Sequence, residues 1–389
     1  MYFRSRITIL HFAFARSVEG RNRMVSRQSL YRGCLLGMAV GDAMGYTVDN
    51  KSWQEIREDY GPNGLLGYDL VNGYADVTSY TQLAAFTCNG LLFGMTRGQL
   101  TGKMAPYIKY IELSSREWAA SQRSWGRPSK CYCWLLRRPE LCRRHCMDTR
   151  MLDTLSREKW STPEEPANNY VTPGGITTAI GVGLFFDPDN MEQPEIDRLG
   201  MEAVALTQGS PQAFLTGAIL AHIMTNLLRH PDAPFKKVIG QAMRCLREQF
   251  GHEYSQTYEI LNLLRHAVAL SEATHLKPQE VMEKLQCDTA PQVLAGAVYA
   301  CMVCREDFDR AMIVAVNHSG RCAAVGAIAG AMLGTRLGEA ALPEFYLECL
   351  EPADTLRELA DDLFHGCPME QGKKLYDGDW DYKYLQGGK

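Results

Sequence analysis

The chain has 389 residues, of which 46% are hydrophobic and 22% charged, a composition typical of a globular protein with a large core. Its formal net charge of −4 argues against nucleic acid as a partner, because binding to nucleic acid depends on an excess of positive charge. Thirteen cysteines, an odd number scattered through a long chain, favour reduced thiols over a disulfide framework, so we expect a cytoplasmic protein.

Residues 1–28 are expected to form an extension ahead of the folded domain. The apolar run at 7–15 follows Arg4 and Arg6, but it is too short to span a membrane, and no small-residue cleavage site follows it. One interpretation is a targeting or anchor segment. The other is a disordered extension that precedes the true translation start at Met24. We favour the extension and expect no membrane partner.

From Ser29 onward, apolar residues recur at the spacing of helices that bury one face. The first such stripe includes Leu30, Leu35 and Leu36, and a second lies at 83–92. The pattern also predicts helices at 214–228, 258–270, 278–285, 292–304, 308–317, 323–337 and 354–364. Alternating apolar and polar residues are nearly absent, and the small residues of 326–334 indicate that helices approach closely. The sequence predicts one compact, orthogonal, all-α domain over 29–370 and a C-terminal tail at 371–389.

Two segments interrupt this pattern. Residues 156–175 are rich in Pro, Asn, Thr and Gly and are predicted to form a long loop, whereas residues 116–150 are predicted to form a basic, cysteine-containing insertion. The cysteines at 131, 133, 142 and 146, near His145, raise the question of zinc, but a Cys-x-Cys opening is unusual for a structural zinc site. Ordinary thiols and a solvated basic face are the interpretations we favour.

Several short motifs follow one another along the chain. They read Gly33-Cys-Leu-Leu-Gly37, Gly41-Asp-Ala-Met-Gly45, Thr78-Ser-Tyr-Thr-Gln82, Leu206-Thr-Gln-Gly-Ser-Pro211 and Asn317-His-Ser-Gly-Arg-Cys-Ala-Ala324. In this order they resemble the motifs of the ADP-ribosylglycohydrolase family, which includes the dinitrogenase reductase-activating glycohydrolases. The resemblance extends from about Tyr31 to Phe364 and implies the all-α fold of that family.

The same resemblance implies a site in which an Asp-Asp pair and an Asp-x-Asp-Ser/Thr loop hold two Mg²⁺ ions. Thr78 matches the family pattern, but Ser79 and Tyr80 replace the two aspartates of the pair. The loop positions are occupied by Arg321, Ala323 and Ala324. Mg²⁺ requires hard oxygen ligands, and two unit charges at about 4 Å repel by roughly 4 kcal/mol at an effective dielectric constant of 20, a value that a dication doubles. We therefore predict that no Mg²⁺ pair forms and that the chain has no cofactor.

The resemblance also suggests which residues line a ligand site. Relatives bind the diphosphate of ADP-ribose at a Gly-rich loop and carry a site-contacting Glu where this chain has an Asp. The residues expected to bind ligand are Asp49, Asn169, Gly174, Gly175, Gln208, His318, Ser319, Gly320 and Arg321. The guanidinium of Arg321 could stand in for a cation by pairing with Asp42, Asp49, Asp76 or a phosphate; the alternative is a structural salt bridge in a vacated cavity.

Three functional hypotheses follow. The leading one is a pseudoenzyme that binds ADP-ribose, an ADP-ribosylated protein or a related nucleotide without cleaving it. The second is a metal-independent ADP-ribosyl glycohydrolase in which Asp42, Asp49 or Asp76 acts as general base. The third is a structural or interaction protein whose cleft is filled by Tyr80 and Arg321. The sequence leaves the oligomeric state open.

Overall fold

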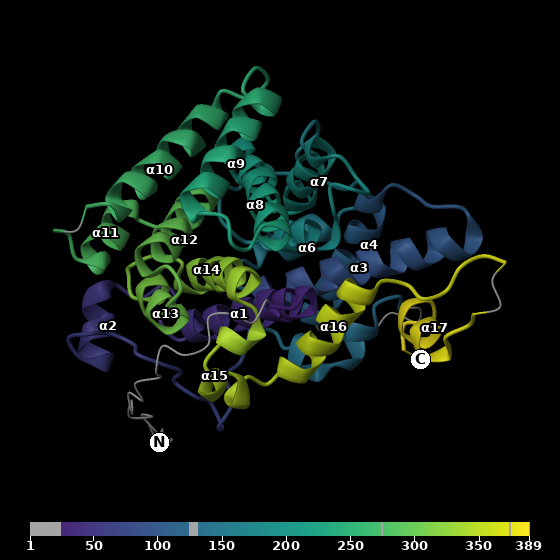
Figure 1. Ribbon diagram of the computed structural model, residues 1–389, viewed down its shortest axis with the longest axis horizontal. Coiled ribbons are helices and arrows are strands. Elements are labelled where there is room, and N and C mark those ends of the chain that lie inside the picture. Colours follow the sequence, from purple (N-terminus) through teal and green to yellow (C-terminus); the bar gives the residue numbers. More distant parts are fainter. Residues whose placement is uncertain (1–24, 124–130, 274, 373–374, 389) are drawn as a thin grey trace.

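The computed structural model describes residues 25–123, 131–273, 275–372 and 375–388. In these residues the regular structure is helical, apart from two isolated β-bridges, so the predicted all-α class is confirmed (Figure 1). The α-helices are α1 (Arg27–Tyr46), α2 (Trp53–Tyr60), α3 (Ser79–Thr101), α4 (Tyr107–Gln122), α5 (Arg150–Leu155), α6 (Thr178–Phe185), α7 (Gln193–Ala205), α8 (Pro211–Arg229), α9 (Phe235–Phe250), α10 (Gln256–Ser271), α11 (Pro278–Leu285), α12 (Ala290–Cys304), α13 (Phe308–Val316), α14 (Cys322–Leu337), α15 (Glu344–Cys349), α16 (Ala353–His365) and α17 (Gly378–Tyr384). Short 3₁₀ helices are η1 (Trp134–Arg137), η2 (Pro139–Leu141) and η3 (Glu339–Ala341).

Helices α1 and α14 form the centre of the domain and pack against each other in opposite directions. Gly33 faces Gly334, Gly37 faces Gly330 and Gly41 faces Gly326, and a Cβ atom at any of the six would collide with backbone on the other helix. The two backbones can approach this closely because glycine carries no side chain at the contact. The prediction that small residues mark close helix packing is confirmed.

The other helices surround this pair. In Figure 1, α8, α9 and α10 lie on one side of α1 and α14, whereas α15 and α16 lie on the other. A single apolar core runs through the domain, and its largest fully buried side chains include Trp118, Tyr80, Tyr299 and Phe214. Because the core is continuous, the described residues form one domain.

The starts of helices α1, α2 and α3 are fixed by local bonds. Ser26 caps α1 through the Ser29 N–H, and Ser52 and Glu55 form a capping box at α2. The hydroxyl of Thr78 caps α3 by accepting from the Tyr80 N–H. Side chains that accept from these first N–H groups satisfy donors that have no partner within the helix. Two rewritten motifs thus lie at helix starts, one at α3 and one at α14, whose N-cap residue is Arg321.

The structure differs from the sequence-based expectations in four respects. The basic segment 116–150 is not a separate insertion, because it begins inside α4 and buries Trp134 and Leu135 in the core. Segment 371–389 was expected to be a tail but carries α17, whose Trp380 indole donates to the Thr96 hydroxyl at 2.9 Å. Helices α2, α4, α5, α6, α7, α9 and α15 were not predicted. The extension expected at 1–28 lies outside the described residues up to residue 24, and α1 already begins at Arg27.

Candidate functional site

Asp42 joins the middle of α1 to the start of α3. Its fully buried carboxylate accepts four hydrogen bonds, from the N–H and hydroxyl groups of Thr78 and Thr81, at 2.7 to 3.0 Å. Burial raises the pKa of Asp42, and these four bonds oppose that effect. Both carboxylate oxygens are engaged within the protein, so the residue acts as a clasp between two helices.

Ser79 stands where the resemblance implies the first metal-binding aspartate. Its hydroxyl oxygen accepts from the Met147 N–H at 3.1 Å, and its own N–H donates to the His145 carbonyl at 3.0 Å. The amide of Gln82, one turn further along α3, donates to the Arg143 carbonyl at 3.0 Å. Segment 143–147 therefore lies across the start of α3, where the resemblance implies a metal site.

Tyr80 replaces the second aspartate and is 2% exposed. Burial raises the pKa of its hydroxyl well above the ordinary value, and the neighbouring charges that act on it include Asp49, Arg321 and Asp148. The phenol is therefore close enough to Arg321 and Asp148 for both charges to act on it. A bulky neutral group occupies the position of a small anionic ligand.

Arg321 is held at the start of α14 by two side chains. Its Nε donates to Asp288 at 3.0 Å and one terminal nitrogen donates to Asn50 at 2.8 Å, while 28% of its side chain stays exposed. Asp49 lies close enough to act on its charge. The pairing with Asp288 was not anticipated from the sequence, whereas Asp49 was among the expected partners.

Asp49 accepts from the Ala323 N–H at 3.0 Å and from the Asn50 amide at 2.8 Å. A carboxylate at this place satisfies one of the first N–H groups of α14 and interacts favourably with the helix dipole. Burial raises the pKa of Asp49 to about 6, although the Ala323 N–H and the charge of Arg321 favour the ionised form. Asp49 is thus the one candidate acid of the three that lies beside the rewritten loop.

Asp76 lies in a surface ion-pair group. Its carboxylate pairs with the guanidinium of Arg143, which also pairs with Glu351. The side chain of Asp76 is 12% exposed, and that of Arg143 is 41% exposed. These bonds give Asp76 a role in holding segment 143–147 against the rest of the domain.

The groups at the family's metal-binding positions do not fit a Mg²⁺ pair. Thr78 donates its hydroxyl to Asp42, Tyr80 is a neutral phenol, and Ala323 and Ala324 are fully buried with no oxygen in their side chains. Mg²⁺ binds through several oxygen ligands, usually including carboxylates. Across the described ranges, no group of three or more His, Cys, Asp or Glu residues is placed to hold a metal ion.

In the Asn317–Gly320 stretch, Asn317, His318 and Gly320 are buried, whereas Ser319 is exposed. His318 is fully buried, with one ring nitrogen 3.0 Å from the Ala315 carbonyl and the other accepting from the Gly320 N–H at 2.9 Å. Burial lowers the pKa of His318 to about 4, so the ring is neutral at physiological pH. Ser319 bonds to Glu283 and to the Trp53 N–H, which ties α13 to α11 and α2. Buried Gly320 lies against the carbonyls of Gln286 and Cys287.

Gly174 and Gly175, expected to approach a diphosphate, are buried against the turn between α7 and α8. A Cβ atom at Gly174 would lie 2.5 Å from the Gln208 amide nitrogen, and one at Gly175 would collide with Thr207. Gln208 is fully buried; its amide oxygen accepts from Thr172 at 3.2 Å, and its amide nitrogen has no partner within the described part of the chain. Asn169 is exposed. The neighbouring residue, Asn168, forms hydrogen bonds within the protein: its side-chain oxygen accepts from the Tyr170 and Gly209 N–H groups at 3.0 and 2.8 Å.

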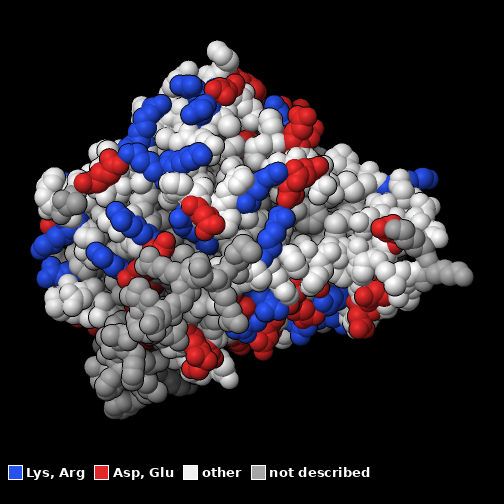
Figure 2. Space-filling view, in the orientation of Figure 1, with Lys and Arg blue, Asp and Glu red and all other residues white. Residues whose placement is uncertain are grey.

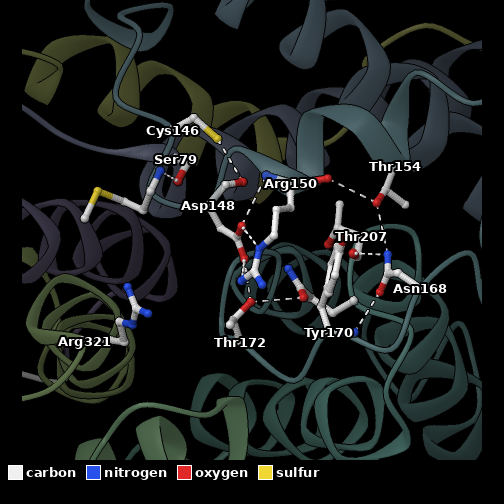
Figure 3. Close-up of polar contacts among 12 residues, drawn as sticks. Ser79, Cys146, Asp148, Arg150, Thr154, Asn168, Tyr170, Thr172, Thr207 and Arg321 are labelled. Carbon is white, nitrogen blue, oxygen red and sulfur yellow. Dashed lines mark hydrogen bonds and ion pairs between the residues drawn. The ribbon is translucent and has the colours of Figure 1, made fainter. Parts of the chain in front are cut away.

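A polar group that the sequence did not reveal lies beside this loop (Figure 3). Asp148 accepts from Arg150 Nε at 2.8 Å and from the Thr172 hydroxyl at 2.6 Å. Burial alone would raise the pKa of Asp148, but the bonds from Arg150 and Thr172 outweigh it and hold the pKa below its usual value. The Arg150 guanidinium also lies over the Tyr170 ring, 4.6 Å from its centroid. Arg150 is exposed, which agrees with the solvated basic face predicted for segment 116–150, and it is also paired with Asp148 two residues before it.

The cysteines of segment 131–146 have protein partners. The Cys142 thiol donates to the Leu135 carbonyl at 3.4 Å and the Cys146 thiol to the Asp148 carbonyl at 3.3 Å. Glu117 of α4 accepts from the Tyr132 and Cys133 N–H groups at 2.8 Å. These hydrogen bonds, together with the burial of Trp134 and Leu135, hold this segment in place. In the residues that the structure describes, no helix has both the length and the hydropathy to cross a bilayer.

Comparison with known proteins agrees with the fold. The sequence profile of the ADP-ribosylglycohydrolase family matches residues 23–373. A solved structure named as an ADP-ribosylglycohydrolase-related protein complex superposes with a TM-score of 0.57 and 22% identity, over 87% of this chain and 98% of that chain. No curated protein matches the sequence. The profile covers most of the chain, and the helical architecture agrees with it: the chain belongs to the ADP-ribosylglycohydrolase family.

Proposed function

We propose that this member of the family binds ADP-ribose, or the ADP-ribose unit of a modified protein, without hydrolysing it. The observation that carries the proposal is the state of the metal-binding positions. Ser79 holds Met147, Tyr80 is buried and Arg321 pairs with Asp288. Each replacement is integrated into the fold, and none supplies an anionic oxygen.

The region between α3, α14 and the 168–175 loop retains features suited to an anionic ligand. Two guanidinium groups belong to it: Arg321 is 28% exposed and Arg150 is 50% exposed at their side chains (Figure 3). A guanidinium binds phosphate through two parallel hydrogen bonds. The unpaired amide nitrogen of Gln208 adds a buried donor beside the glycine loop.

One observation favours a second candidate, the interaction protein with a filled cleft. Segment 143–147 crosses the start of α3, and the Tyr80 ring is buried beside it. The metal-independent hydrolase receives less support, because Asp42 and Asp76 are both committed to bonds within the protein. Asp49 remains its candidate base, with a pKa of about 6 in the range that suits general base catalysis.

Calorimetric titration of ADP-ribose, in EDTA and separately in Mg²⁺, tests the proposal. We expect the same dissociation constant in both buffers. Arg321→Ala and Arg150→Ala should each weaken binding by about tenfold or more, since a hydrogen bond to a charged group contributes roughly 1.5–3 kcal/mol. Arg265→Ala on α10 is the matched control and should bind as the native chain does.

The outcomes separate the three hypotheses. Binding heat that requires Mg²⁺ would contradict the proposal. Absence of heat, together with an unchanged melting temperature, would favour the filled cleft. Release of ADP-ribose from an arginine-modified protein in EDTA would identify a metal-independent hydrolase.

Restoring the family's ligands provides an independent test. The variant combines Ser79→Asp, Tyr80→Asp, Arg321→Asp, Ala323→Asp and Ala324→Thr. We expect it to bind Mg²⁺ measurably, with low activity because Gln208 and Thr178 still stand where the family pattern has a histidine and an arginine. A folded variant that does not bind Mg²⁺ would mean that the overlying segment 143–147, and not the lost carboxylates, excludes the metal.

A further inference from the structure

A groove with acidic walls, about 1480 Å³ in volume, lies between α15 and the starts of α13 and α16. Among the described residues that line it, eight are Asp or Glu and one, Arg357, is basic. Its surface also includes the exposed aromatic side chains of Tyr74 and Phe345. On the face drawn in Figure 2, over α9 and α10 for example, Lys and Arg side chains lie among Asp and Glu side chains. The excess of negative charge in the groove contrasts with the mixed charge of that part of the surface.

Part of the negative charge in the groove is not neutralised by the described part of the chain. The one basic lining residue, Arg357, is already paired with Glu339 and Asp354. Three exposed glutamates of the walls form no ion pair with any described residue: Glu306, Glu344 and Glu348. Glu306 belongs to the turn before α13, whereas the other two belong to α15. Like charges around one groove repel each other, and a cationic occupant relieves that repulsion.

The described chain begins next to this groove. Val25 contacts Gly338, where an added Cβ atom would lie 2.6 Å from the Val25 Cγ1 atom. The hydroxyl of Ser29 accepts from the N–H of Glu339, a lining residue of the groove, at 3.0 Å. A segment of 24 residues spans up to about 80 Å when fully extended. Residues 1–24 are therefore long enough to reach any part of the groove from Val25.

The composition of residues 1–24 is complementary to the groove. The segment contains five arginines, at positions 4, 6, 16, 21 and 23, and a single acidic residue, Glu19. The apolar run 7–15, with Phe12 and Phe14, lies between the second and third arginines. Guanidinium groups form strong hydrogen bonds with carboxylates, and aromatic side chains are enriched at the centres of interfaces. Positive charge on both sides of an apolar run matches acidic walls around exposed aromatic side chains.

We propose that residues 1–24 of this chain are the occupant of the groove. Their arginines pair with the three glutamates that lack an ion pair, and their apolar run covers Tyr74 and Phe345. The groove is then an intramolecular docking surface for a cationic segment with aromatic side chains. None of the residues proposed to bind ADP-ribose is among its described lining residues, so this inference does not depend on the proposed function.

Chymotrypsin cleavage of the full 389-residue chain, followed by mass spectrometry, tests the proposal. This protease cuts after aromatic residues, so cleavage after Phe12 and Phe14 reports how often the segment leaves the groove. Cleavage rates follow the population of the open form when opening and closing are fast relative to cleavage. The exposed Tyr376 is the internal reference, because it lies outside both the segment and the groove.

Reversing charges in the groove should release the segment. In the variant that combines Glu306→Lys and Glu348→Lys, we expect cleavage at the two phenylalanines to become about fivefold faster or more relative to cleavage at Tyr376, because each reversal replaces an attraction with a repulsion. The matched control combines Glu248→Lys on α9 and Glu280→Lys on α11, which change the net charge equally and should leave the ratio as in the native chain. Equal ratios in the groove variant and the control variant would overturn the proposal.

The native chain gives a second answer if the groove variant does not fold. Raising the ionic strength from about 0.01 M to about 1 M shortens the Debye length from about 30 Å to about 3 Å, which weakens pairs between exposed charges. Cleavage in the segment should then become faster relative to cleavage at Tyr376, and a ratio that salt leaves unchanged would contradict the proposal. The ratio should also be independent of protein concentration. Protection that increases with concentration would place the segment in the groove of a second copy and would equally overturn docking within one chain.

Discussion

The clasp formed by Asp42 gives a sharp test of whether this residue is structural. Replacing it by alanine leaves the N–H groups of Thr78 and Thr81 buried without an acceptor, whereas the two threonine hydroxyls can rotate toward other acceptors. An unsatisfied buried donor costs about 1–3 kcal/mol, and two such N–H groups are left by this substitution. We expect Asp42→Ala to lower the free energy of unfolding by about 2–6 kcal/mol.

Asparagine is the matched comparison because it keeps the shape of the side chain. Its amide oxygen can accept the Thr78 and Thr81 N–H groups in place of Oδ2, and its NH₂ group can donate to the Thr78 hydroxyl in place of Oδ1. It also removes the desolvation of a carboxylate, the effect that raises the pKa of Asp42. We expect Asp42→Asn to change the free energy of unfolding by no more than about 1 kcal/mol.

Urea unfolding of the native chain and both variants, at several pH values, measures these differences. A carboxyl group whose pKa is raised in the folded state contributes stability below its unfolded pKa and loses it as pH rises toward the folded pKa. The native chain should therefore lose stability relative to Asp42→Asn as pH increases from about 4, with equal m values. If Asp42→Ala were as stable as the native chain, or Asp42→Asn as unstable as alanine, the hydrogen-bond reasoning would be wrong.

Three further predictions concern other parts of the fold. Burial lowers the pKa of His318 to about 4, so the folded chain should lose stability as pH falls from about 6.5 toward 4. In thermal unfolding, His318→Asn should abolish this pH dependence of stability. Gly41→Ala should destabilise the chain by about 3 kcal/mol or more, because its Cβ meets the Gly326 carbonyl; an unchanged urea midpoint would contradict the close packing. Glu117→Ala should release the 131–133 backbone, which hydrogen exchange at Tyr132 and Cys133 would detect as faster exchange than in Glu112→Ala.

The sequence by itself determined the helical class and much of the helix positions. Helix α11 was predicted with its observed bounds, and α13 and α14 to within one residue, because helical periodicity is a local property of the chain. The glycine and alanine residues of 326–334 signalled the contact between α1 and α14, because absent side chains permit close backbones. Helix α9 was missed although Val238, Ala242 and Leu246 carry the same periodicity. The loss of the metal-binding aspartates was also readable, since it is a matter of residue type alone.

Only the tertiary structure decided what the replacements do. Ser79 meets Met147, Arg321 meets Asp288, and His222 meets Asp197 across distances in sequence that no periodicity encodes. His318 shows the limit most clearly: its motif suggested a residue that faces ligand, but the turn after α13 directs the ring into the core. A side chain's direction depends on how distant helices pack around it, and that packing is a property of the whole chain.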